Sequence, residues 1–303
     1  MTSIVFPGQG SQFKGMAKDF YDNFSIAKET IEEIEDYVGI DLKKIIFEND
    51  KNLLDITKYS QISIFTASVI IFKTFQKEKN LDIELIDTMM GHSLGEYTAL
   101  ACSNKLSLEE SSLILKKRGE LMNNAVEPHT SAMAALIGNS AEQVQKIIKE
   151  NEINLQIAND NSPIQVVISG ALEEIQKNKE LFLDNNIKKY ILLNVSAAFH
   201  SDYMKEAQDI LSDDIGKLNF KSNKINIISN YTAEDSDSID KIKYSIQNQM
   251  ANTVKWTDSI KRLEERGEKE IIEIGPNKVL SGLIKRISNS FDIKSISNID
   301  DLN

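Results

Sequence analysis

The stretch Thr88-Met89-Met90-Gly91-His92-Ser93-Leu94-Gly95 decides the fold of this 303-residue chain. Apolar residues run into Gly91, and helical spacing follows from Leu94 to Cys102, so we expect a strand over Ile83–Met90, a tight turn and a helix. Gly91 to Gly95 match G-x-S-x-G, a strained turn that lifts a serine hydroxyl into a cleft. A plain glycine–serine turn is the simpler interpretation, but the strand–turn–helix placement favours a catalytic serine.

The segments around this turn alternate between short apolar runs and longer amphipathic ones, which is typical of an α/β protein. Ser107 with Glu110 forms a capping box that predicts a helix to about Asn124. The other elements that we expect outside the middle of the chain are strands at Ile4–Phe6, Ile225–Ser229 and Glu270–Ile274, and helices at Trp256–Arg266 and Val279–Ile287.

The middle of the chain has the order β-α-β-β-α-β, which is the ferredoxin-like plan. We therefore expect a small domain at 126–196, inserted into an α/β body made of 1–125 and 197–303. Its predicted elements are a strand at Ala132–Ile137, a helix capped by Ser140 with Gln143, strands at Ile153–Ala158 and Gln165–Ser169, a helix at Ala171–Asn185 and a strand at Lys189–Val195.

The composition excludes several classes of function. With 46 acidic and 35 basic side chains, the net charge of −11 argues against a nucleic-acid surface, which needs a basic footprint. The single Cys102 cannot form an internal disulfide, and neither C-x-x-C nor H-x-x-x-H occurs, so we expect a reducing compartment and no zinc site.

No targeting or membrane segment is expected. The N-terminus lacks a basic region, and the longest apolar stretch, Ile62–Phe75, is broken by polar residues and is shorter than the roughly 20 residues of a spanning helix. We predict that this stretch is a buried core helix and that the protein is cytoplasmic.

A catalytic serine needs a base, and the chain has three histidines. The side chain of His92 should diverge from that of its neighbour Ser93, and His129 lies in a polar loop. His200 directly follows the last strand of the insert, where a cleft between domains would be lined, so elimination favours it as the base. No acid can be assigned as a third member; the acids in plausible regions are Asp160, Asp184 and Asp202.

Arg118 lies on an apolar stripe of the helix that starts near Ser107, together with Leu115 and Met122. Two interpretations are open: the side chain reaches out to solvent, or it pairs with a buried anion. If the substrate carries a carboxylate, Arg118 is its natural bidentate partner.

The loop Pro7-Gly8-Gln9-Gly10-Ser11-Gln12 follows the first strand in the manner of a dinucleotide-binding turn. G-x-G-x-x-G would require glycine where Phe13 stands, so we reject a nicotinamide cofactor. The backbone N–H groups of this loop remain available to an anion.

Taken together, the motifs resemble the malonyl-CoA:acyl carrier protein transacylase family of fatty acid and polyketide synthesis, over essentially the whole chain. They occur in the family's order. Besides the two turns above they are Arg118-Gly119, Ala132-Met133-Ala134-Ala135, Asn159-Asp160-Asn161-Ser162-Pro163, Gln165 to Gly170, Phe199-His200-Ser201, Gln249 and Glu273-Ile274-Gly275-Pro276-Asn277-Lys278-Val279-Leu280.

The resemblance implies an α/β-hydrolase-like core with a ferredoxin-like insert, and it implies roles at matching positions. Ser93 is the acylated nucleophile and His200 its base, oriented by a backbone carbonyl near Gln249 in place of an acid. The N–H groups of Gln9 and Leu94 form the oxyanion hole. Arg118 holds the malonyl carboxylate, whereas no chemistry is assigned to Asn159, Asn161 and Gln165, which border the cleft.

The implied reaction is ping-pong transfer of malonyl from malonyl-CoA through a malonyl-serine ester to the phosphopantetheine thiol of acyl carrier protein, without metal or redox cofactor. The resemblance also implies that Phe199 accompanies a preference for malonyl over methylmalonyl, and a ring at that position would crowd an α-methyl branch. A stand-alone chain favours fatty acid synthesis, and the family leads us to expect a monomer.

Three alternatives remain beside this interpretation: an acyl-thioester hydrolase of the same fold, a trans-acting polyketide synthase acyltransferase, and a non-catalytic module that binds carrier protein. Because carrier proteins are typically acidic, docking on this acidic chain would require a local basic patch. The candidates are Lys116, Lys117, Lys261, Arg262, Lys285 and Arg286.

Overall fold

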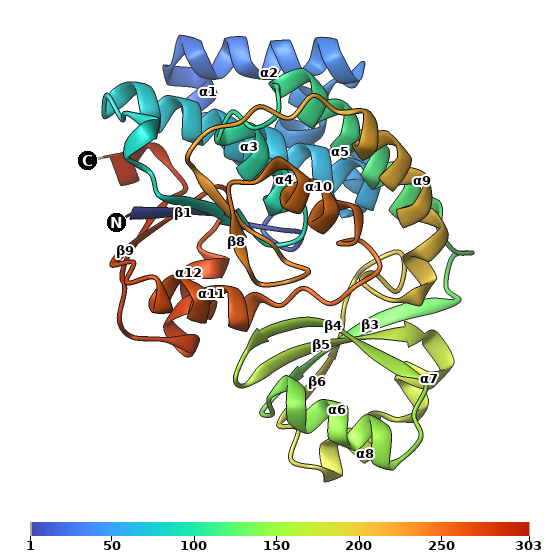
Figure 1. Cartoon of the computed structure of the whole chain (residues 1–303). Coiled ribbons are helices and arrows are strands. Elements are labelled where there is room, and N and C mark those ends of the chain that lie inside the picture. Colours follow the sequence, from blue (N-terminus) through green and yellow to red (C-terminus); the bar gives the residue numbers. More distant parts are fainter. Residues whose placement is uncertain (1, 303) are drawn as a thin grey trace.

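A computed structural model describes residues 2–302 and shows two sheets flanked by helices (Figure 1). The larger sheet has the strand order β10-β9-β1-β2-β7-β8, parallel throughout except for the pairing of β7 with β8. Its strands are β1 (Thr2–Phe6), β2 (Thr88–Gly91), β7 (Asn226–Ile228), β8 (Asp235–Ser236), β9 (Glu270–Ile274) and β10 (Asp292–Ile296).

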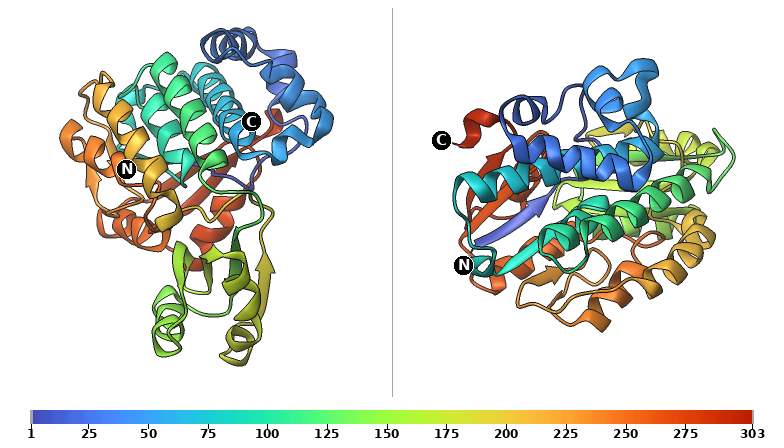
Figure 2. Two further views of the ribbon diagram at one scale, coloured as in Figure 1. Left: turned by 90° about the vertical axis from the view of Figure 1, so that its right-hand side faces the viewer. Right: turned by 90° about the horizontal axis from the view of Figure 1, so that it is seen from above.

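Helices cover both faces of the larger sheet, because successive side chains of a buried parallel strand point to opposite faces. In β1, Ile4 and Phe6 join the core under α3 and α4, whereas Val5 packs with residues of α11 and α12 on the other face (Figure 2). The helices of this part are α1 (Lys18–Asn23), α2 (Ser25–Val38), α3 (Thr57–Glu78), α4 (Leu94–Cys102), α5 (Leu108–Asn124), α9 (Lys205–Lys217), α10 (Ile239–Gln247), α11 (Trp256–Glu265) and α12 (Val279–Ile287). Short 3₁₀ or π segments lie at Lys44–Glu48, Asp50–Asp55, Ile83–Leu85, Asp202–Met204 and Ile299–Leu302.

The smaller sheet is antiparallel with the order β4-β5-β3-β6, which is the ferredoxin-like arrangement. Its elements are β3 (Ser131–Ile137), α6 (Ala141–Glu150), β4 (Leu155–Ser162), β5 (Gln165–Ala171), α7 (Leu172–Lys177), α8 (Lys179–Asp184) and β6 (Lys189–Leu192). Ala134 and Leu136 of β3 face a core of this sheet's own, whereas Met133 and Ala135 belong to the core shared with the larger part. One face of the small sheet is therefore a wall against the larger part.

The predicted fold class, an α/β-hydrolase-like core with a ferredoxin-like small sheet, is confirmed. The smaller sheet lies within the predicted insert, but the division into a domain at 126–196 and a body at 1–125 and 197–303 stays a prediction. The helix predicted over Ile62–Phe75 is the buried part of α3, and within residues 2–302 no helix is both long and apolar enough to cross a membrane.

The structure corrects four predicted elements. The strand expected over Ile83–Met90 is a 3₁₀ turn at Ile83–Leu85 followed by the short β2. The strand expected to end at Ala158 instead continues as β4 to Ser162, because bulges accommodate the additional residues against β5. The helix expected over Ala171–Asn185 is interrupted at Asn178, whose side chain donates to the carbonyl of Glu174 at 2.9 Å, and the strand expected to reach Val195 ends at Leu192.

Candidate active site

Ser93 occupies a strained turn between β2 and α4, with φ 52° and ψ −107°. The turn requires glycine on both sides of the serine because the backbones approach closely. A Cβ at Gly91 would lie 2.1 Å from the carbonyl carbon of Gly95, and a Cβ at Gly95 would lie 2.2 Å from the oxygen of Phe6. A backbone conformation in a sparsely populated φ/ψ region, such as that of Ser93, costs about 1–3 kcal/mol of stability and persists only where its surroundings fix it.

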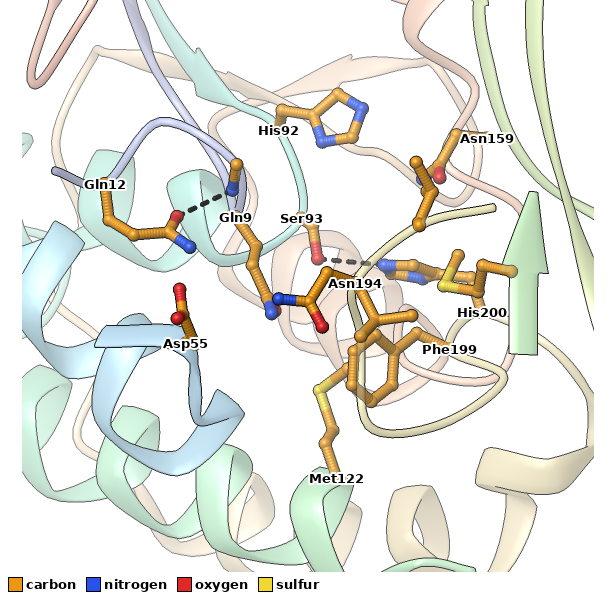
Figure 3. Close-up of a pocket in the computed structure, with 14 residues that line it drawn as sticks. Gln9, Gln12, Asp55, His92, Ser93, Met122, Asn159, Asn194, Phe199 and His200 are labelled. Carbon is orange, nitrogen blue, oxygen red and sulfur yellow. Dashed lines mark hydrogen bonds between the residues drawn. The ribbon is translucent and has the colours of Figure 1, made fainter. Parts of the chain in front are cut away.

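His200 lies against Ser93 from the far side of the cleft, with 2.8 Å between its Nε2 and the serine Oγ (Figure 3). Its Nδ1 lies 3.1 Å from the carbonyl oxygens of both Gln249 and Asn252. Carbonyls only accept hydrogen bonds, so Nδ1 carries the proton and Nε2 is free to accept the proton of Ser93. Burial, followed by the nearby charge of Arg118 and by His92, lowers the pKa of His200 to about 3. The imidazole is therefore neutral at physiological pH.

The guanidinium of Arg118 is fully buried beneath the serine, so the side chain does not reach out to solvent. Its Nη1 donates to Oε1 of Gln61 at 2.6 Å, and its Nη2 donates to Oγ of Ser93 and to Oε1 of Gln249, each at 3.0 Å. Within the described residues, no carboxylate oxygen lies within 4 Å of this guanidinium. A buried cation held by neutral acceptors is suited to an incoming carboxylate.

The N–H groups predicted for the oxyanion hole come from the loop after β1 and from the start of α4. Gln9 lines the cavity, and Leu94 is the first residue of α4, where N–H groups have no acceptor within the helix. In the described part of the chain, neither of these two N–H groups donates a hydrogen bond, so both are available to a ligand.

The cavity at Ser93 has a volume of about 370 Å³ and lies between the larger sheet and the wall formed by the small sheet (Figure 3). Met122, Met133 and Phe199 supply apolar surface, and polar surface comes from both sides of the cleft, at Gln9, Asp55, Asn159 and Asn194. A cavity of this size, with apolar walls and a few polar groups, is suited to a small ligand.

The other histidines and acids considered from the sequence lie outside the serine–histidine contact. Nε2 of His92 donates to Oδ1 of Asn161 at 2.8 Å, and the His92 ring packs on Trp256, whereas His129 is exposed in its loop. Asp160 accepts from Thr257 at 2.6 Å, Asp202 pairs with Lys205, and Asp184 ends α8. Gln165 accepts from Arg286 at 2.7 Å. Backbone carbonyls therefore take the place that an acid would occupy beside His200.

Four buried polar side chains around Ser93, those of Gln61, Glu96, Asn230 and Gln249, make contacts that the sequence does not predict; for Gln249 only the backbone carbonyl is expected. Gln61 holds Arg118, and the side chain of Gln249 donates to the carbonyl of Ser93 at 2.8 Å. Glu96 accepts from Gln249 at 2.8 Å and from the N–H of Asn230 at 3.1 Å, and burial raises the pKa of Glu96 to about 7. Only Glu96 lies near the turn in sequence, and no local pattern marks the other three.

The cations considered for carrier docking are mostly engaged in contacts within the chain. Lys117 pairs with Asp214, Lys261 with Asp258, and Arg262 with Asp235 and Glu265. Lys116 donates to the carbonyl of Val38, Arg286 donates to Gln165, and Lys285 is exposed.

Among the described residues there is no group of three or more histidine, cysteine or acidic side chains placed to hold a metal ion.

The family model described as the acyl transferase domain matches residues 4–300. Malonyl CoA-acyl carrier protein transacylase of Bacillus subtilis (strain 168) is 36% identical over 298 residues, covering 97% of this chain and 93% of its own. Polyketide biosynthesis protein PksE of the same strain is 39% identical over 293 residues, which are 95% of this chain and 37% of PksE. A solved type II polyketide synthase malonyl-transacylase, in complex with its acyl-carrier protein, superposes with a TM-score of 0.94 at 32% identity, covering 99% of this chain and 97% of that one. The chain therefore belongs to the acyl transferase family.

Proposed function

We propose that this acyltransferase moves a malonyl group from malonyl-CoA to the phosphopantetheine thiol of acyl carrier protein, through a malonyl ester on Ser93. The observation that carries the proposal is that one hydroxyl contacts both a base and a carboxylate-binding group. Oγ of Ser93 lies 2.8 Å from Nε2 of His200 and 3.0 Å from Nη2 of Arg118.

In the first half-reaction, His200 Nε2 accepts the proton of Ser93 as Oγ attacks the thioester carbonyl. The oxyanion that forms accepts hydrogen bonds from the N–H groups of Gln9 and Leu94. The carbon–sulfur bond then breaks, and the proton passes from His200 to the sulfur of coenzyme A, leaving the malonyl ester on Ser93.

The second half-reaction runs through the same groups in reverse order. His200 takes the proton of the phosphopantetheine thiol, and the sulfur attacks the ester carbonyl. The bond between that carbon and Oγ breaks, and the proton of His200 returns to Oγ. The carbonyls of Gln249 and Asn252 keep Nδ1 protonated throughout, so Nε2 is the atom that exchanges protons in both halves.

Selectivity for malonyl rests on Arg118 and Phe199 in this proposal. The buried guanidinium supplies the positive charge that a malonyl carboxylate needs, and it gives no advantage to an uncharged acyl group. Phe199 lines the cavity and is 4% exposed, so an α-methyl branch would meet a ring with little room to move.

For the carrier protein we propose that of fatty acid synthesis, with a trans-acting role in polyketide synthesis as the alternative. The likeness to a Bacillus subtilis malonyl CoA-acyl carrier protein transacylase supports the first, and the likeness to PksE supports the second. We further propose a monomeric enzyme, as the family resemblance leads us to expect. We propose a cytoplasmic location, since the only cysteine is a buried free thiol. We also propose a separate domain at 126–196, since the small sheet has a core of its own.

Steady-state kinetics with malonyl-CoA and holo acyl carrier protein test the proposal. Parallel double-reciprocal lines, and their loss in Ser93→Ala, are expected for the ping-pong route. A carrier-independent release of malonate at the same rate as transfer would instead identify a thioester hydrolase of the same fold. Turnover unchanged in Ser93→Ala would contradict the assignment of Ser93 as the nucleophile, whereas a wild-type protein that binds the carrier without turnover would have only a carrier-binding role.

A further inference from the structure

We propose that Asn230 is a positioning residue that holds the turn at Ser93 in its reactive shape. The inference rests on the proposed role of Ser93 as the nucleophile, and it assigns a function to a side chain that touches neither the acyl group nor His200.

The sheet topology brings Asn230 to the turn. Strands β2 and β7 are parallel neighbours in the register Thr88 with Asn226 and Met89 with Ile227. Asn230 follows the end of β7 as Ser93 follows the end of β2, so the two residues meet at the same edge of the sheet. This edge is where open α/β sheets place their sites.

Asn230 is fully buried, and its side chain bridges the two sides of the turn. Its Oδ1 accepts from the backbone N–H of Ser93 at 2.7 Å, and its Nδ2 donates to the carbonyl of Gly91 at 2.8 Å. These two contacts need one acceptor and one donor on one planar group, which is what an amide provides.

Asn230 is in turn fixed by its neighbours. Its own N–H donates to Oε2 of Glu96 at 3.1 Å, and Gln249, which also binds the carbonyl of Ser93, approaches its Oδ1 at 3.4 Å. A strained backbone conformation persists only when its surroundings over-determine it. The Asn230 bridge supplies that restraint at Ser93, and it therefore keeps Oγ near His200 and the Leu94 N–H turned toward the oxyanion.

The test measures the reactivity of Ser93 separately from substrate recognition. An alkyl fluorophosphonate reacts with an activated serine: the bond from Oγ to phosphorus forms, the phosphorus–fluorine bond breaks, and His200 takes the serine proton. Labelling rates and malonyl transfer are compared in wild type, Asn230→Ala and Asn230→Asp. Ser93→Ala is the labelling blank.

Asn139→Ala is the matched control. Asn139 is also buried and donates from Nδ2 to a backbone carbonyl, that of Asn185 at 3.0 Å, but it lies in the small-sheet part. The Asn139→Ala variant loses a comparable hydrogen bond, but Asn139 does not contact the turn at Ser93. This variant therefore separates the effect of lost stability from the effect of a displaced serine.

We expect Asn230→Ala to lower both the labelling rate and kcat by about 10²-fold, the effect of a displacement of about 1 Å at a reacting group. KM for malonyl-CoA should stay within about threefold of the wild-type value, because Asn230 does not contact Arg118 or Phe199, to which we assign substrate binding. Asn139→Ala should match wild type in both rates.

Asn230→Asp provides a second readout if the alanine variant does not fold. An ionised carboxylate keeps the acceptor for Ser93 but loses the donor for Gly91, whereas a protonated one restores both. The activity of Asn230→Asp relative to wild type should therefore rise as the pH falls, since burial raises the pKa of a carboxyl group.

Wild-type labelling rates in folded Asn230→Ala, or a loss confined to KM, would overturn the positioning role, as would a pH-independent activity ratio for Asn230→Asp. Absence of labelling in wild type, by contrast, would overturn the proposed nucleophile itself.

Discussion

Nη2 of Arg118 donates a hydrogen bond to Oγ of Ser93 at 3.0 Å, so the group proposed to bind the substrate carboxylate contacts the proposed nucleophile directly. The same Oγ faces Nε2 of His200 at 2.8 Å. A malonyl carboxylate that takes hydrogen bonds from Arg118 competes with Ser93 for them, and a lone pair of Oγ then becomes available for attack. Binding of the correct acyl group and activation of the serine are thus linked through one guanidinium.

Replacement of Arg118 should change acyl selectivity. Arg118→Ala is expected to cost malonyl transfer about 2–5 kcal/mol in kcat/KM, the usual effect of removing one partner of a buried charge pair. Acetyl transfer should fall far less, because an acetyl group has no carboxylate. Rates with malonyl-CoA and acetyl-CoA measure the ratio.

Lys116→Ala is the control for Arg118. It removes a cation from the same helix, where Lys116 donates to the carbonyl of Val38. It should leave the ratio unchanged. Equal losses with both acyl groups in Arg118→Ala would mean that Arg118 only supports the fold.

The rate of acylation should not fall as the pH drops through about 6.5, as it would with a histidine base of ordinary pKa. The folded pKa of His200, about 3, lies below the usual 6.5, so its neutral, proton-accepting form is present at all pH values well above 3 and is lost only as the pH falls toward 3. The rate of acyl-enzyme formation, measured in single turnovers, should stay nearly level from about pH 8 to about pH 5.

Glu96 provides the control for that profile, because its raised pKa of about 7 falls inside the range. Glu96→Gln should remove any remaining dependence near pH 7. A rate that falls to half near pH 6.5 in both wild type and Glu96→Gln would contradict the state assigned to His200.

Much of the fold and of the site could be predicted from the sequence because those features are local. The turn at Ser93 has glycines at fixed spacing, Ser107 and Glu110 mark the start of α5, and His200 follows from elimination among three histidines. Whether the guanidinium of Arg118 is buried or reaches solvent could not be predicted in this way. Burial at its position depends on Gln61 and Gln249, which come from distant segments.

Asn230 shows the same limit most clearly. It lies 137 residues from Ser93 in sequence, and only the pairing of β2 with β7 brings the two together. The continuation of β4 beyond Ala158 could not be predicted for a related reason. Its polar residues indicate a loop, but contacts such as the hydrogen bond of Asn161 with His92 and the bridge to Val254 keep it extended within β4.

A smaller side chain at Phe199 should relax selectivity toward branched acyl groups. Phe199→Ala is expected to raise the ratio of methylmalonyl to malonyl transfer by about 10- to 200-fold, the range that one pocket contact provides. Competition between methylmalonyl-CoA and malonyl-CoA measures it. Phe182→Leu, in the core of the small sheet, controls for destabilisation and should leave the ratio unchanged. A ratio unaltered in Phe199→Ala would exclude the ring as a selectivity element.

Salt should weaken use of the carrier protein despite the net charge of −11. Raising the ionic strength from about 0.05 M to about 0.5 M should lower kcat/KM for acyl carrier protein, because exposed charge pairs are screened over a few ångströms at high salt. Lys285→Glu, at an exposed cation, should have the same effect at low salt, whereas Lys261→Glu should have less, since Lys261 already pairs with Asp258. A salt-independent kcat/KM would exclude charge-guided docking.

The central claim is that Ser93 carries the malonyl group between two thiols, and the mass of the intact protein tests it most directly. After exposure to malonyl-CoA, the protein should gain one malonyl increment located on Ser93, absent from Ser93→Ala, and addition of holo acyl carrier protein should discharge it much faster than water does. An increment that persists in Ser93→Ala, or a discharge rate that the carrier protein does not change, would contradict the account.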